Sequence, residues 1–182
     1  MGLQLIFVVE TNKKCNSDWI YIKDTIEHFY QYDRAQCLFK PVYMDGKGKY
    51  QRKESEIRSF ISQYASTSKM NQTKVICCFD CDDYDKNKED ADFLKEAQQY
   101  CKTHGYDFVW FCKDIERVYL EKQVEENKKK VEATAFKEKK RITKVDEKKL
   151  SANSYRSNTS NIMTVLDNYL TRKSDKKFLV IP

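Results

Sequence analysis

The residues of this sequence best suited to chemistry are three acids that follow apolar runs. Glu10 comes directly after the run at residues 3–9, and Asp80 and Asp82 follow the run that ends at Phe79. Carboxylates gathered in one place repel one another unless a cation lies between them, and a hard dication ligated by oxygen is the usual partner. We therefore expect Glu10, Asp80 and Asp82 to hold Mg²⁺ or Mn²⁺, with phosphate oxygens completing the coordination. The alternative is that these acids are ordinary solvated loop residues.

Basic side chains follow two of the apolar runs. Lys13 and Lys14 come shortly after Glu10, and a second basic group follows the run at residues 38–44. Lysine and arginine beside a metal site bind phosphates and stabilise developing negative charge. We select five of them as candidates for contact with a nucleic-acid backbone: Lys13, Lys14, Lys47, Lys49 and Arg52. For each one, the alternative is a solvated loop cation.

The cysteines bear on the compartment and offer a rival metal site. There are seven, an odd number, and several lie inside apolar runs, which favours free thiols in a reducing cytoplasm over a disulfide framework. Cys78-x-x-Cys81 and Cys101-x-x-His104 have the spacing of zinc ligands, although Cys78 belongs to a predicted core strand and Cys101 to the end of a predicted helix. No apolar stretch is long enough for a membrane span. Glycine-rich phosphate loops and nucleophile elbows are absent from the sequence.

The elements that must position these residues alternate between strand and helix. Continuous apolar runs predict strands buried on both faces, and apolar residues at helical spacing predict the helices between them. Gly105 predicts the end of the third helix. The expected order is strand 3–9, helix 17–32, strand 38–44, helix 53–65, strand 74–79, helix 87–103 and strand 107–112. Such alternation predicts an α/β fold with a mainly parallel central sheet flanked by helices, whose strands end at a common edge.

The composition changes after about residue 120. Residues 121–150 hold eleven basic and seven acidic residues with few apolar ones, which predicts exposed helices with a thin apolar stripe. The lysines of 128–141 either clamp a nucleic-acid backbone or form ion pairs along a helix, and the sequence leaves both open. We divide the chain into an α/β core at 1–120 and a basic helical extension at 121–182. Within the extension we expect a last helix from about 160 to 170, which packs back on the core, and a short edge strand at 178–181.

The placement of the acids resembles the Toprim fold of topoisomerases, primases and related nucleases. The matching segments are Val8-Val9-Glu10 and, two crossovers later, Cys78-Phe79-Asp80-Cys81-Asp82. More narrowly, residues 3–120 resemble the RloB/AbiL-like group of bacterial phage-defence (abortive infection) proteins. An acidic, aromatic-rich motif of that group is similar to residues 111–120, with Glu116 as its acid. Thr11 to Lys14 depart from the family pattern, in which a glycine and a second acid often follow the glutamate.

This resemblance implies a function. It implies a Mg²⁺-dependent endonuclease or related phosphotransfer enzyme, with Glu10 as general base or metal ligand, Asp80 and Asp82 as metal ligands and Glu116 as a further site acid. It also implies a role in phage defence and an ATPase partner protein. Two alternatives stay open: a non-catalytic module that binds nucleic acid or a partner protein, and a receiver-like domain in which Lys113 would face the acids.

Overall fold

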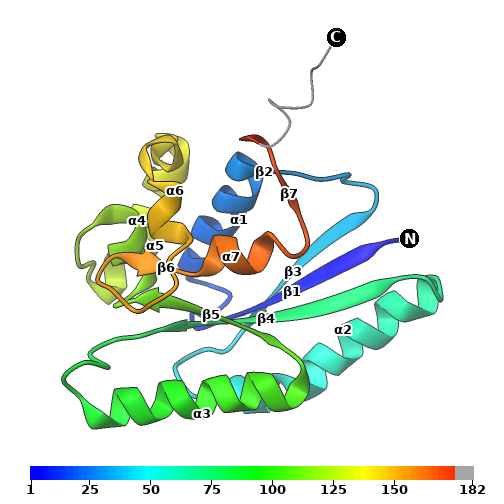
Figure 1. Cartoon of the computed structure of the whole chain (residues 1–182), viewed down its shortest axis with the longest axis horizontal. Helices are drawn as coiled ribbons and strands as arrows, with labels where there is room; N and C mark the ends of the chain where they lie inside the picture. Colours follow the sequence, from blue (N-terminus) through cyan, green and yellow to red (C-terminus); the bar gives the residue numbers. More distant parts are fainter. Residues whose placement is uncertain (175–182) are drawn as a thin grey trace.

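Five strands form the central sheet, and the computed structural model describes residues 1–174 of the chain (Figure 1). The strands lie in the order β3-β1-β4-β5-β6. The first four are parallel, and β6 is antiparallel to β5. Their bounds are β1 (Leu3–Val9), β3 (Cys37–Tyr43), β4 (Gln72–Asp80), β5 (Asp107–Cys112) and β6 (Thr159–Ser160). The predicted α/β fold with a mainly parallel sheet is therefore confirmed.

Helices cover both faces of this sheet. One face carries α2 (Glu54–Thr67) and α3 (Lys88–His104), and the opposite face carries α1 (Ser17–Phe29) and the helices that follow β5 (Figure 1). The latter are α4 (Ile115–Leu120), α5 (Lys129–Glu138), α6 (Glu147–Leu150) and α7 (Ile162–Leu166). Short 3-10 helices span Tyr50–Lys53, Glu126–Lys128 and Arg141–Lys144.

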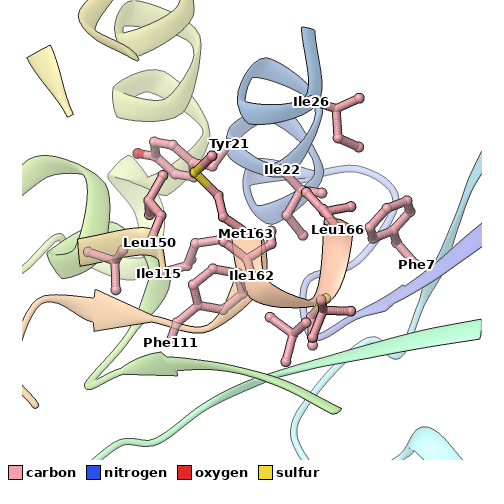
Figure 2. Close-up of a cluster of buried hydrophobic side chains, with 14 of the residues drawn as sticks. Phe7, Tyr21, Ile22, Ile26, Phe111, Ile115, Leu150, Ile162, Met163 and Leu166 are labelled. Atoms are coloured by element: carbon pink, nitrogen blue, oxygen red, sulfur yellow. The ribbon is translucent and has the colours of Figure 1, made fainter. Parts of the chain in front are cut away.

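The central strand β1 is apolar throughout because both of its faces are covered. Leu5, Phe7 and Val9 face the core on the α1 side, whereas Ile6 and Val8 face the core under α2 and α3, and all five are inaccessible to solvent. Figure 2 shows part of the α1-side core, to which Phe7 of β1, Ile22 of α1 and Leu166 of α7 belong. Burying each such side chain contributes roughly 1.5–3 kcal/mol, which fixes the sheet and so the strand ends that follow it.

Two predicted helix ends were wrong for the same reason. Helix α1 stops at Phe29, not near residue 32, because Tyr30–Gln31 forms β2 and pairs antiparallel with Thr171–Arg172 (β7). The last helix, α7, is also shorter than expected, because strand pairings lie on both sides of it: Thr159–Ser160 forms β6 against β5 before the helix, and the turn after Leu166 leads into β7. A strand pairing of two residues leaves no periodic pattern in the sequence. By contrast, Gly105 ends α3 in the left-handed conformation (φ 68°), as predicted.

The segment after residue 120 belongs to the packed structure. Helix α5 lies against α1, and Phe136 is inaccessible to solvent and packs edge-on against the rings of Tyr21 and Tyr119. Ile142 and Leu150 are also buried in the α1-side core. The thin apolar stripe expected for this segment is present, and its few apolar residues pack into the core while most of its charged side chains stay exposed. The strand expected at 178–181 lies outside the described residues.

Candidate functional site

The structure brings Glu10 and Asp80 together at the carboxyl edge of the sheet. Glu10 follows β1 and Asp80 is the last residue of β4, and these two strands are parallel neighbours with Val8 opposite Cys77. The backbone N–H of Asp80 donates to Glu10 Oε1 over 3.0 Å. Neighbouring parallel strands thus place two carboxyl groups from distant parts of the sequence beside each other.

Each of these two carboxyl groups is oriented by one backbone donor. Glu10 accepts from the N–H of Asp80, and Asp80 Oδ1 accepts from the N–H of Ile115 over 3.0 Å. Within residues 1–174, the second oxygen of each carboxyl group makes no hydrogen bond. The pair therefore presents two oriented oxygens that are available to a ligand.

The proximity of these acids opposes their ionisation. Burial raises the pKa of Glu10 to about 8, although the bond from the Asp80 N–H opposes the shift, and nearby Asp18 and Asp82 add to it. Burial, with the charge of Glu10 next in importance, raises the pKa of Asp80 well above its ordinary value. A cation bound nearby would therefore stabilise the ionised forms of both carboxyl groups and lower their pKa values.

A cavity of about 280 Å³ gives access to this pair. Its walls come from the residues after β1, the turn after β3, and the segment that leads into α5. Asp18 in the first turn of α1 also lines it, 6% exposed, and its Oδ2 accepts from the N–H of Thr11 over 3.1 Å. Asp18 was not predicted as a site residue. Its place in the first helical turn after the loop that follows β1 could have indicated that it lies near the strand ends. The cavity is lined by Glu10, Thr11, Asn12, Asp18, Asp45, Gly46, Lys47, Asp80, Glu126 and Lys129.

The third expected metal ligand, Asp82, lies in an ion pair. It sits two residues beyond the end of β4 with left-handed backbone (φ 47°). Lys47 Nζ lies 2.6 Å from Asp82 Oδ2 and 2.6 Å from Asp90 Oδ1. The Asp82 carboxylate is thus bound by an ammonium group, while Glu10 and Asp80 face the cavity. Its role as a metal ligand stays a prediction.

Glu116 lies in the protein interior beside Lys129. Its side chain is 1% exposed, Oε2 lies 3.8 Å from Lys129 Nζ, and Oε1 is buried without a hydrogen-bond partner among the described residues. Burial raises the pKa of Glu116 to about 7, and attraction to Lys129 offsets part of that shift. Lys129 was not singled out from the sequence, because it is one lysine of a lysine-rich segment.

The five basic candidates are placed unequally. Lys47 lines the cavity, whereas the side chains of the other four do not. Lys13, Lys14 and Arg52 are exposed, and Lys49 pairs with Asp45 on the protein surface. Contact of these residues with nucleic acid remains a prediction, and Lys47 is the one whose position next to the acids supports it.

The two metal hypotheses differ in how well the residues fit. Within residues 1–174, no three Asp, Glu, His or Cys side chains form a metal-binding group. Mg²⁺ is commonly held through one or two carboxylates with water on the remaining positions, so the Glu10–Asp80 pair fits it. The zinc alternative does not fit, because Cys78 faces the α1-side core whereas Cys81 and Cys101 lie in the other core.

Comparison with protein-family models, with curated proteins and with solved structures gave no match to the chain. Its resemblance to Toprim and RloB/AbiL-like proteins thus rests on the motifs quoted above.

Two further properties of the structure concern its helices and its cysteines. None of the helices in the described part of the chain has the length and apolar character of a membrane span. All seven cysteines are free thiols.

Proposed function

We propose that this protein is a Mg²⁺- or Mn²⁺-dependent phosphotransfer enzyme of the Toprim/RloB type that cleaves nucleic acid in the cytoplasm. The observation that carries the proposal is the Glu10–Asp80 pair, two oriented carboxyl groups on the wall of a cavity that Lys47 and Lys129 flank. The net charge of +6 favours an anionic substrate, and the free thiols fit a reducing compartment. The role in phage defence and the ATPase partner follow from the family resemblance.

In such a reaction the acids around the cavity would bind the metal ion, and the lysines would stabilise negative charge on the phosphate. A bound dication would polarise the phosphoryl group and lower the pKa of its water. Glu10 and Asp80 would hold that ion through their free oxygens. Lys129, and Lys47 when it leaves Asp82, would stabilise the charge that develops on the phosphate. Because burial raises the pKa of Glu10 to about 8 and that of Asp80 well above its ordinary value, the site would release at least one proton on binding the ion near pH 7.

The direct test is cleavage of nucleic acid by the purified protein. Single-stranded and duplex DNA and RNA are incubated with the protein in Mg²⁺, in Mn²⁺ and in EDTA. We expect cleavage that depends on the metal and falls at least a hundredfold in Glu10→Gln and Asp80→Asn. Asp92→Asn is the matched control, because Asp92 is a half-exposed acid on α3 that pairs with Lys95. No cleavage of any of these substrates, or equal activity in all variants, would refute the proposal.

One observation favours a second candidate, a non-catalytic module that binds nucleic acid. Lys47 and Lys129 already neutralise part of the acidic cluster, which reduces its need for a metal ion. This candidate predicts binding that weakens steeply with salt and persists in EDTA. The receiver-like alternative is less well supported, because Lys113 pairs with the exposed Asp83 and Asp85 and not with the buried acids.

A further inference from the structure

We propose that the Lys129 ammonium group takes the place of a second cation, so that the site binds one divalent ion and not two. This inference rests on the proposed function, because it concerns how many metal ions the same site accepts. It also assigns a role to the basic segment after residue 120, which supplies the residue.

Lys129 lies where its ammonium group reaches the acids of the site. It is the first residue of α5, and its side chain is 19% exposed. Its Nζ lies 3.2 Å from Glu126 Oε2 and 3.8 Å from Glu116 Oε2, and it lines the same cavity as Glu10 and Asp80. It is close enough to Asp18 and Asp80 to interact with both electrostatically. An ammonium group in this position faces acids from β4, α1 and α4.

The charges around the cavity do not balance. Six acids lie in or beneath it: Asp45 and Glu126 are exposed to solvent, whereas Glu10, Asp18, Asp80 and Glu116 are buried or partly buried. The two lysines of the cavity are not equally available to them, because Lys47 is bound by Asp82 and Asp90. Lys129 is thus the cation that neutralises part of the negative charge of the buried acids. One divalent ion beside Glu10 and Asp80 would neutralise most of the remainder.

The packing of α5 holds Lys129 in place. Helix α5 is fixed on α1 by Phe136, and the adjacent Lys130 Nζ donates to the carbonyl oxygen of Lys14 over 2.8 Å. The position of the ammonium group is therefore set by the fold, unlike that of a surface lysine. Glu116 Oε1 is buried and unpartnered among the described residues, so it can serve as a ligand once the ammonium group is removed.

The test is the number of metal ions that the protein binds. Metal-free full-length protein is titrated with Mn²⁺ by isothermal calorimetry at pH 8, with the bound ion confirmed by electron paramagnetic resonance. We expect one Mn²⁺ per chain for the wild type and for Lys129→Arg, and two for Lys129→Met. Lys128→Met is the control, because Lys128 is exposed and pairs with Glu125. It should leave the stoichiometry at one.

The outcomes separate this inference from the proposed function. One ion in both the wild type and Lys129→Met would overturn the inference while leaving the metal-dependent enzyme intact. No Mn²⁺ bound by the wild type would overturn both. Thermal melting establishes that each variant is folded. If Lys129→Met does not fold, Lys129→Gln serves in its place, since it removes the charge but keeps a polar group, and the same stoichiometries are expected.

Discussion

Glu116 gives a prediction about stability whose sign depends on which of two forces is larger. Burial opposes ionisation of this carboxyl group, whereas Lys129 favours it from a distance of 3.8 Å. Glu116→Gln removes the ionisation and nearly preserves the shape. If burial is the larger effect, the variant is more stable than the wild type at alkaline pH. If the ion pair is the larger effect, the variant is less stable there.

The magnitude follows from proton linkage. The pKa of Glu116 rises from an ordinary value of 4.5 to about 7 on folding, and each pKa unit corresponds to about 1.4 kcal/mol. Between these two values the folded state binds more protons than the unfolded state, so wild-type stability falls as the pH rises. Ionised Glu116 thus destabilises the folded state by about 3 kcal/mol above pH 7 and by nothing below pH 4.5.

The assay is urea denaturation of both proteins in EDTA at several pH values from 4 to 8.5. We expect equal free energies of unfolding near pH 4 and an advantage for Glu116→Gln that grows to about 3 kcal/mol by pH 8. Glu125→Gln is the control, because the side chain of Glu125 is 70% exposed, and its effect should stay within about 0.5 kcal/mol. A constant difference across this range, or a Glu116→Gln protein that is less stable at pH 8, would refute the reasoning.

Three further predictions concern packing, the sheet edge and the site. Phe136→Ala should lower the free energy of unfolding by about 3–5 kcal/mol in chemical denaturation, whereas Val131→Ala, at a residue 68% exposed on the same helix, should change it by less than about 0.5 kcal/mol. Asn161→Ala should cost about 1–3 kcal/mol and speed amide exchange at Trp110, because the Asn161 side chain accepts from that N–H over 2.9 Å. The affinity for Mn²⁺ should rise at least tenfold per pH unit between pH 6 and 7, since burial raises the pKa of both Glu10 and Asp80 and the ion displaces their protons; calorimetry at pH 6, 7 and 8.5 measures this.

The sequence predicted the parts of the fold that long patterns encode. Buried strands such as β1 and β4 are continuous apolar runs, and residues directly after them must lie at the carboxyl edge, which is why Glu10 and Asp80 could be paired in advance. The short strands β2, β6 and β7 could not be predicted, because two residues carry no periodicity. Their formation depends on partners far along the chain.

In the candidate site, too, long sequence patterns predicted some residues, and others depend on tertiary contacts that the sequence does not show. Asp18 reaches the cavity because α1 covers the sheet, and Lys129 reaches it because α5 packs on α1; no local sequence pattern indicates either contact. Asp82 was expected from its spacing to Asp80, but spacing alone does not reveal that Lys47 would bind it. Residue type and strand position thus identify candidate acids, whereas tertiary contacts decide which of them stay open to a ligand.

The contact between Lys130 and the carbonyl oxygen of Lys14 joins the beginning of the chain to a helix more than a hundred residues later. The acids come mainly from the first two thirds of the chain, and the partly buried Lys129 ammonium group comes from the last third. A fragment ending at residue 120 would therefore retain most of the acids, yet lose their counter-charge and the helices that pack with α1 over one side of the sheet. Any shortened version of this protein that is to keep a working centre must extend past α5.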